Sequence, residues 1–314
     1  MGVVLLLGPT ASGKTSLAMA VQDHMGGSHR VQLISMDSAL VYRGMDIGSA
    51  KPTKQELAHY PHRLIDIRDP AEPYTAADFV TDADEAVREA VAAGQHALLV
   101  GGTMLYARCF QFGIADLPES DPSVRESLAS RWQREGGEAL YQELQDLDPE
   151  AASGLDANNR QRLLRALEVI HSTGRKISDL WRENAGQDAS TRLGQAVHAV
   201  AVPEIQRGEL HARIEQRFDQ MLTTGFLDEV RALKARPELH LDLPSMRAVG
   251  YRQAWQHLAG ELDESQFRAD SLTATRRLAK RQLTWLRSWP ELTRLPESPL
   301  EQQIARIASL LTAP

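Results

Sequence analysis

The sequence is short of cysteine, of long apolar runs and of net positive charge. Its single cysteine, Cys109, excludes an intramolecular disulfide and fits the reducing cytosol, so we expect a cytoplasmic protein. No apolar run approaches the roughly 18 residues that cross a bilayer, so we expect neither a membrane span nor a secretory leader. The net charge of −7 gives no general attraction to nucleic acid, and any RNA site must be a local basic patch.

The sequence also lacks the spacing of a zinc site, although it contains ten histidines. They form no HExxH pair, and His59 and His62 are separated by a proline, so we expect no zinc. The remaining composition is that of an ordinary globular protein. Of 314 residues, 42% are hydrophobic and 25% are charged, which fits one large or two modest domains.

Short apolar runs alternate with helical patterns over the first hundred residues. The runs at 3–7, 31–35, 63–67 and 96–100 predict strands, and the patterns at 14–25 and 76–93 predict helices. Strands that alternate with helices in this way favour a parallel sheet covered on both faces. The predicted fold class is therefore α/β.

The strand pattern fades after residue 115, where two prolines interrupt the chain. Helical, charge-rich patterns follow at 124–134, 138–147 and 159–172, and an alternating segment at 195–203 is typical of a strand that rejoins the sheet. We therefore predict an all-helical insertion. The expected domains are residues 1–115 as the first part of the core, 116–194 as the insertion, and 195–314 as the rest of the core with C-terminal helices.

Residues 8–15 read GPTASGKT, which matches the phosphate-binding loop G-x-x-x-x-G-K-[ST] between a predicted strand and a predicted helix. The glycines let the backbone wrap an anion, and the helix N-terminus adds a favourable dipole. Lys14 supplies a mobile positive charge, and Thr15 is the expected ligand of a Mg²⁺ cofactor. The residues predicted to surround the phosphates are Gly8, Pro9, Thr10, Ala11, Ser12, Gly13, Lys14 and Thr15.

The loop alone does not say which polyphosphate it holds. An ATP-binding motor protein would place a Mg²⁺-binding acid after a later strand, but HALLVGG at 96–102 ends in glycines. The acid follows the second strand instead, as Asp37 in LISMDS. This pattern favours a small-molecule kinase, or a relative that uses the cradle for another diphosphate.

Further segments carry a family resemblance over essentially the whole chain. They read SMDSALVYRGMDIGSAKP at 35–52, PHRLIDIRDP at 61–70, GGTMLY at 101–106, PSMRAVGYR at 244–252 and ATRRLAKRQLTWLR at 274–287. Together with GPTASGKT, they resemble in order and spacing the bacterial tRNA dimethylallyltransferases, also called tRNA isopentenyltransferases. Two departures are mild: the family usually has Thr in place of Ser49 and Gln in place of Arg277. A single cysteine excludes the C-terminal zinc finger of eukaryotic relatives.

The resemblance implies a reaction and its partners. Dimethylallyl diphosphate would alkylate N6 of the adenosine 3′-adjacent to the anticodon, in tRNAs that read codons beginning with U. The products would be N6-isopentenyladenosine and diphosphate. The implied partner is the anticodon stem-loop of tRNA, bound by a cytoplasmic monomer.

The resemblance also assigns catalytic roles to four residues, three of which have a plainer alternative. Asp37 would accept the N6 proton or orient the amine, but an Asp before Ser also commonly caps a helix or a turn. Thr103 would contact substrate, or cap a helix. Lys14 and Arg217 would reach the diphosphate, although Arg217 also fits a solvated helix face.

The implied tRNA-facing positions lie in several segments. A basic stretch between Arg276 and Arg287 has five basic residues, no acid and a tryptophan, whereas a solvated face more often mixes charge signs. The target adenine must be flipped out of a stacked loop. The positions are Asp37, Ser38, Ala39, Leu40, Thr103, Arg125, Gln161, Arg162, Leu163, Leu164, Arg165, Arg247, Ala248, Val249, Gly250, Tyr251, Arg252, Lys280, Arg281, Gln282, Trp285 and Arg287.

Two other functions remain open at this point. A nucleoside or small-molecule kinase would use ATP in the same cradle, but it does not explain the basic C-terminal stretch. An RNA-binding protein without catalysis explains that stretch but leaves Asp37 and the intact GKT without a purpose.

Overall fold

The computed structural model describes residues 1–314 except 116, 119, 184, 185 and 314. The chain forms two compact units. One joins Met1–Gln111 to Ala189–Pro314, and the other is Phe112–Asp188. Each unit is described by itself below.

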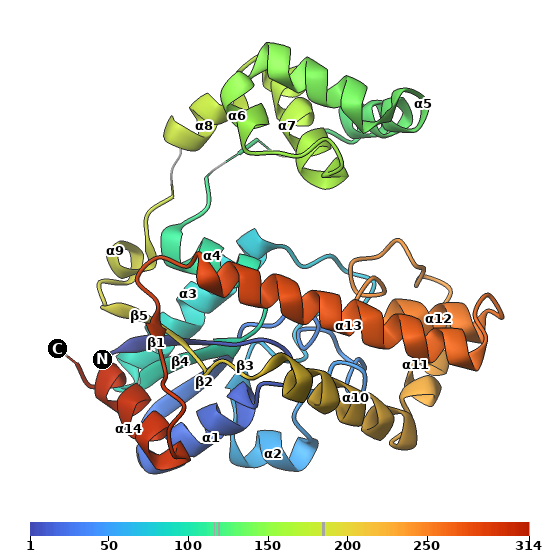
Figure 1. The fold of residues 1–314 in the computed structure, drawn as a ribbon. Helices are drawn as coiled ribbons and strands as arrows, with labels where there is room; N and C mark the ends of the chain where they lie inside the picture. Colours follow the sequence, from blue (N-terminus) through green and yellow to red (C-terminus); the bar gives the residue numbers. More distant parts are fainter. Residues whose placement is uncertain (116, 119, 184–185, 314) are drawn as a thin grey trace. The chain divides into compact units, whose positions relative to one another are not determined.

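The larger unit is built on one parallel sheet of six strands, in the order β3-β2-β4-β1-β5-β6 (Figure 1). Val3 of β1 is aligned with Ala97 of β4 on one side and with Val197 of β5 on the other. The carboxyl ends of the strands therefore meet at one edge, where ligands bind in open α/β sheets. The strands are β1 (Val3–Leu7), β2 (Val31–Ser35), β3 (His62–Arg63), β4 (His96–Gly101), β5 (Val197–Ala201) and β6 (Thr293–Arg294).

Helices cover both faces of this sheet, as the apolar strands predict. Val4 and Leu6 of β1 pack with α1 (Lys14–His24) and α14 (Leu300–Leu311) on one face. The alternate side chains of β1 pack into the core of the other face. That core is formed with α3 (Ala76–Ala92), α4 (Met104–Phe112), α10 (Arg207–Thr223), α11 (Phe226–Lys234), α12 (Tyr251–Leu258) and α13 (Glu264–Arg287). Two short helices, α2 (Lys54–His59) and α9 (Ala189–Leu193), complete the unit.

The smaller unit is helical, as predicted, and has a core of its own. It contains α5 (Pro122–Leu147), α6 (Pro149–Ser153), α7 (Arg160–Thr173) and α8 (Ile177–Glu183). The sequence predicts two helices where α5 lies, and Gly136 interrupts α5 with φ 82° between them. Buried Asp148 ties three helices together, because it ends α5, caps α6 and accepts hydrogen bonds from Ser178 of α8.

The strand predictions fail at two places. The predicted strand at 63–67 is only His62–Arg63, because Leu64 and Asp66 have positive φ and turn the chain away from the sheet. The edge strand β6 was not predicted, since two residues carry no readable alternation. Among the described residues, no helix is long and apolar enough to cross a membrane.

Candidate active site

The GPTASGKT loop forms a cradle of backbone N–H groups between β1 and α1, of which the Thr10 N–H is bonded to Gln282. Ala11 and Gly13 have φ of 61° and 83°, and this left-handed backbone turns the chain into the helix. Gly13 caps α1 and no side chain bonds to the first turn, so these N–H groups remain available to an anion. The predicted phosphate loop thus has the backbone form that anion binding needs.

Two side chains of the cradle are poised for a ligand. The Ser12 hydroxyl oxygen is buried and has no hydrogen-bond partner among the described residues. Among the residues that the structure describes, Lys14 Nζ has one hydrogen-bond partner, the Pro9 carbonyl at 3.3 Å. The pKa of Lys14 is lowered to about 8, chiefly by burial; the nearby Asp37 carboxylate opposes this shift and Arg217 adds to it. A buried ammonium group beside an orphaned hydroxyl is suited to a bound anion.

The predicted catalytic residues come from neighbouring strand ends. Asp37 follows β2, Thr103 follows β4 and the cradle follows β1, and these three strands are adjacent in the sheet. The chain pieces approach closely, since a Cβ on Gly101 would lie 1.9 Å from the Met36 carbonyl oxygen. Glycine at 101 is therefore required to bring the Asp37 loop against the end of β4.

Thr103 ties the Asp37 loop in place. Its hydroxyl accepts a hydrogen bond from the Ser38 N–H at 3.0 Å and donates to the Ser38 hydroxyl at 3.2 Å. In the described part of the chain, no backbone N–H of α4 is found to donate to the Thr103 hydroxyl. The helix-capping alternative therefore has no support in the hydrogen bonds of this hydroxyl.

Asp37 forms a turn through one of its carboxylate oxygens. Its Oδ1 accepts the Ala39 N–H at 2.9 Å, which is a turn-forming bond. No donor from the described residues reaches Oδ2. The half-buried carboxylate is therefore fixed through one oxygen and can accept a proton at the other.

Arg217 of α10 completes the charge pattern. Its Nη2 donates to the Ser49 carbonyl at 3.2 Å. Burial lowers the pKa of Arg217, while Asp37 raises it, so the guanidinium lies within electrostatic reach of that carboxylate rather than on a solvated face. Lys14 and Arg217 together outweigh the charge of Asp37, and this net positive charge favours an anionic ligand.

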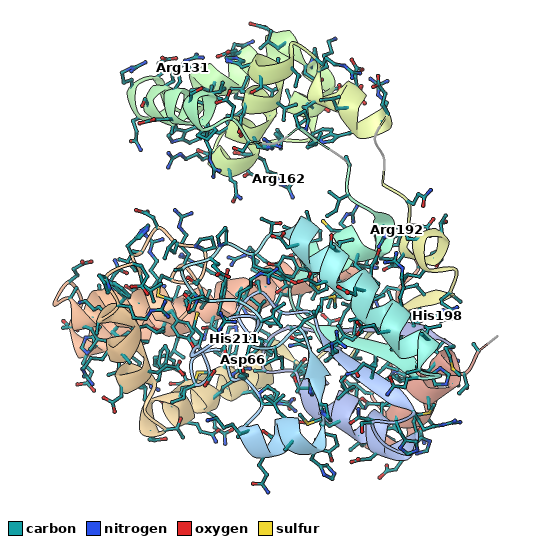
Figure 2. The ribbon with its side chains drawn as sticks, turned by 180° about the vertical axis from the view of Figure 1, so that it is seen from behind. Asp66, Arg131, Arg162, Arg192, His198 and His211 are labelled. Atoms are coloured by element: carbon teal, nitrogen blue, oxygen red, sulfur yellow. The ribbon has the colours of Figure 1, made fainter. Side chains whose placement is uncertain are left out.

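The loop that carries Asp37 and Ser49 is braced by two residues that the sequence analysis did not assign. Glu229 of α11 accepts the N–H groups of Asp46, Ile47 and Gly48 at 2.8, 2.7 and 3.1 Å. Lys51 is nearly buried and donates to the Tyr42 carbonyl and to Asp46 at 2.8 and 2.6 Å. Lys51 also bonds to Asp66 at 2.5 Å, and Figure 2 marks Asp66 in the larger unit. The motif lysine is visible in the sequence, but its pairing with Asp46 and Asp66 is seen only in the structure.

Burial divides the predicted tRNA-facing positions of the larger unit. Ser38, Arg247, Arg252, Lys280, Arg281 and Arg287 are exposed, whereas Asp37, Ala39, Leu40, Thr103, Ala248, Val249 and Trp285 are partly buried. Gly250, Tyr251 and Gln282 are buried. The Tyr251 hydroxyl donates to Glu229 at 2.6 Å, so this ring braces the loop instead of facing RNA. Gln282 points into the cradle.

The basic stretch forms a groove on α13. Arg276 and Arg287 lie 3.6 and 3.5 Å from Glu215 and Glu204, so part of their charge is balanced. No salt bridge to a described residue balances the remaining three basic side chains. They line a cavity of about 310 Å³ with a hydroxyl and an indole, formed by Arg277, Lys280, Arg281, Thr284 and Trp285. The sequence predicts five unpaired basic side chains in this stretch. In the fold, three of them have no salt bridge to a described residue.

The helical unit presents the other predicted RNA positions. Arg125, Gln161 and Arg162 are exposed, and Figure 2 shows Arg162 at the surface of this unit. Leu163 is fully buried in the core of the unit, which contradicts its predicted contact with RNA. Leu164 is partly buried. Arg165 donates to the Pro118 carbonyl at 2.5 Å and pairs with Glu168, so its charge is used within the unit.

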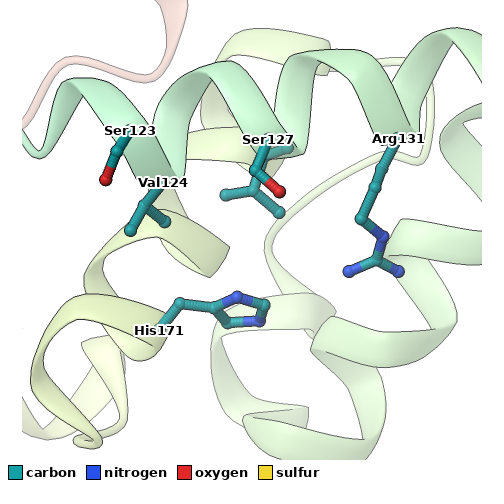
Figure 3. Close-up of a pocket in the computed structure, with 6 residues that line it drawn as sticks. Ser123, Val124, Ser127, Arg131 and His171 are labelled. Atoms are coloured by element: carbon teal, nitrogen blue, oxygen red, sulfur yellow. The ribbon is translucent and has the colours of Figure 1, made fainter.

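A second cavity of about 290 Å³ lies between α5 and α7 of the helical unit. Figure 3 shows Arg131 and His171 on its walls, with Ser123, Val124 and Ser127 along α5. Both basic groups bind Glu143, at 2.7 and 2.8 Å, and Arg131 also binds Glu135 at 3.0 Å. Because these carboxylates balance the charge of Arg131, the cavity has no surplus positive charge for an anion.

The residues of the cradle fit a Mg²⁺ ion that takes few ligands from the protein. Within the described ranges, no group of three or more His, Cys, Asp or Glu side chains could hold a metal. Mg²⁺ commonly takes one or two protein oxygens and completes its shell with phosphate oxygens and water. The Thr15 hydroxyl, within the cradle, would be one such protein oxygen in that arrangement.

Comparison with known proteins gives a consistent picture. The model of the family described as IPP transferase matches residues 40–289. A tRNA dimethylallyltransferase from Chromohalobacter salexigens is 54% identical over 91% of this chain and 89% of its own length. A protein named tRNA dimethylallyltransferase 2 from Hahella chejuensis is 47% identical over 92% and 89% of the two chains.

Solved structures share the fold. The full-length tRNA isopentenylpyrophosphate transferase from Bacillus halodurans matches with a TM-score of 0.67 and 33% identity, over 99% of this chain and 95% of that one. A eukaryotic dimethylallyltransferase acting on tRNA matches with a TM-score of 0.77 over 98% and 77% of the two chains. At 22% identity, this second likeness concerns the fold alone.

Proposed function

This chain belongs to the IPP transferase family, and on that premise we propose that it transfers the dimethylallyl group from dimethylallyl diphosphate to a tRNA adenine. The acceptor is N6 of the adenosine 3′-adjacent to the anticodon in tRNAs that read codons beginning with U. The products are N6-isopentenyladenosine and diphosphate. One observation supports this most directly: the Asp37 carboxylate, with one oxygen unbonded, is held beside a phosphate cradle with two partly buried cations.

Asp37 acts on the acceptor. The N6 amine is a weak nucleophile because its lone pair is delocalised into the adenine ring. The free oxygen of Asp37 accepts the N6 proton, or orients the amine, as nitrogen attacks the allylic carbon. Thr103 holds the Asp37 loop through Ser38, so the carboxylate is positioned before substrate arrives.

The cradle acts on the leaving group. Negative charge grows on the diphosphate as the allylic C–O bond breaks. The free N–H groups at the start of α1, Ser12, Lys14 and Arg217 are already directed at that charge, so stabilising it requires no reorganisation. A Mg²⁺ ion held by Thr15 would add further positive charge next to the diphosphate oxygens.

The groove on α13 supports RNA as the acceptor. A nucleoside kinase has no need for three unbalanced cations and an indole outside its cradle. Arg and Lys bind phosphates, and an indole can stack on an unpaired base. We further propose that the anticodon stem-loop occupies this groove and that the protein acts as a cytoplasmic monomer.

One assay tests the proposal against its rivals. Purified protein is incubated with Mg²⁺, unmodified tRNA and either dimethylallyl diphosphate or γ-labelled ATP, and the digested nucleosides are identified by mass spectrometry. We expect N6-isopentenyladenosine from the first donor and no label transfer from the second. Transfer of the γ-phosphate would establish a kinase, and RNA binding without either product would establish a non-catalytic binding protein.

The groove also predicts a salt dependence. Each phosphate contact to single-stranded nucleic acid contributes a slope of roughly −0.7 to log K against log[salt]. The three unbalanced cations should therefore contribute a slope of about −2. Arg281→Ala should flatten the total slope by about 0.7 and weaken all tRNAs alike, because a phosphate contact does not read sequence. Filter binding over a salt series measures this, and Arg231→Ala, on an exposed arginine of α11 paired with Asp228, is the control. An unchanged slope for Arg281→Ala would place that side chain off the RNA.

A further inference from the structure

Gln282 lies on the RNA-facing helix but uses both ends of its amide at the cradle. Its Oε1 accepts the Thr10 N–H at 2.9 Å, and its Nε2 donates to the Gly102 carbonyl at 2.8 Å. One partner can only donate and the other can only accept, so a single orientation of the amide satisfies both. The side chain is 6% exposed.

The end of β4 is shaped to admit this amide. A Cβ at Gly102 would lie 2.6 Å from Gln282 Nε2 and 3.2 Å from the Gly8 carbonyl oxygen. The same position is 3.5 Å from Lys14 Nζ. Glycine at 102 therefore lets Gln282 bridge two loops, next to the ammonium group that faces the ligand.

Gln282 faces away from the cations of its own helix. Ala279 and Leu286, three residues before and four after it, are buried with it and define the inner face of α13. Lys280 and Arg281 are exposed on the outer side. The helix thus presents cations to solvent on one side and an amide to the cradle on the other.

We propose that Gln282 is a positioning residue for the diphosphate site, which locks the phosphate loop to the end of β4. The inference rests on the proposed function and names one more residue that shapes the same site. Because Gln282 holds the Thr10 N–H, the donors left for the diphosphate are those nearer the start of α1. The two bonds fix the loop before ligand binds, and a preorganised site binds more tightly than a mobile one.

The test separates diphosphate binding from RNA binding. Gln282→Met keeps the length of the side chain and removes both hydrogen bonds. Inorganic pyrophosphate with Mg²⁺ serves as the probe in calorimetry, and kinetic assays give the KM for dimethylallyl diphosphate. We expect both constants to rise about tenfold, the effect of losing roughly one net hydrogen bond, while tRNA affinity stays within about twofold.

A matched control and a second variant guard against misfolding. Gln266→Met changes an exposed glutamine of the same helix and should alter neither constant. Gln282→Glu keeps an acceptor for Thr10 but, when ionised, cannot donate to Gly102. Relative to wild type at the same pH, its pyrophosphate affinity should recover as the pH falls from 7 towards 5, because the protonated carboxyl both accepts and donates. Gln282→Met should show no such recovery.

The outcomes are distinct. Weakened tRNA binding with unchanged pyrophosphate binding would overturn the proposal and place Gln282 on the RNA, as the sequence predicted. Absence of pyrophosphate binding in the wild type would also overturn it. If the wild type forms no prenylated adenosine but Gln282→Met still loses pyrophosphate affinity, the positioning role holds and the proposed reaction fails.

Discussion

Asp37→Ala should lower the turnover number by about 10²- to 10⁴-fold, the usual contribution of a general acid or base. The affinity for tRNA should fall far less, because RNA binding depends chiefly on phosphate contacts elsewhere. Single-turnover assays at saturating tRNA and dimethylallyl diphosphate measure the chemical step directly. Near-normal turnover in a folded Asp37→Ala protein would remove the carboxylate from the mechanism.

Asp37→Asn separates the two roles of this side chain. The amide oxygen can still accept the Ala39 N–H, so the turn should persist. The amide cannot take up the N6 proton. We therefore expect Asp37→Asn to lose nearly as much activity as Asp37→Ala while retaining the wild-type melting temperature. Recovery of activity in Asp37→Asn would mean that Asp37 matters for the loop and not for the proton.

Lys14→Met should lower kcat/KM for dimethylallyl diphosphate by about 10²- to 10³-fold, as expected when one preorganised donor to a developing anion is removed. The side chain lies against the cradle, and burial already makes its charge costly in the free protein. Binding of a diphosphate offsets that cost. The matched control is Lys54→Met, which removes an exposed lysine at the start of α2 and should leave kcat/KM unchanged.

The pH profile gives Lys14 a signature that loss of structure would not imitate. Its pKa in the free protein is about 8, so the ammonium is present below that pH and is lost above it. Pyrophosphate affinity should therefore decline as the pH rises through about 8 and stay level in the range just below. The decline should disappear in Lys14→Met, as calorimetry between pH 7 and 9 can show. The same decline in the variant would assign the titration to another group.

The core elements were readable from sequence because their signals are local. A run of apolar residues before GPTASGKT predicts a strand, a phosphate loop and a helix, and these are β1, the cradle and α1. The break at Gly136 was readable for the same reason, since glycine readily takes positive φ. The strand predicted at 63–67 failed because its conformation depends on distant partners: the Asp66 carboxylate bonds to Lys51, fifteen residues earlier.

The predicted tRNA-facing positions show what the sequence pattern and the family resemblance could not predict. The sequence motif predicts RNA contact for Lys280, Arg281 and Gln282 without distinguishing them. Successive residues of a helix, however, point in different directions. Two of them face solvent and the third lies inside. Counting charges along the sequence likewise fails to predict which cations are unpaired. Glu204 and Glu215 lie more than sixty residues before the arginines that they balance.

Sequence by itself therefore determined the parallel sheet, the phosphate cradle and the position of Asp37 after a strand, because each depends on neighbouring residues. Only the tertiary structure decided which charges remain unbalanced, which oxygen of Asp37 is free, and that Glu229 and Gln282 brace the site. The physical reason is that burial and hydrogen-bond partnership are set by segments far apart in the chain. Glu229 meets Asp46 across 183 residues and Gln282 meets Thr10 across 272, distances over which a local pattern carries no information.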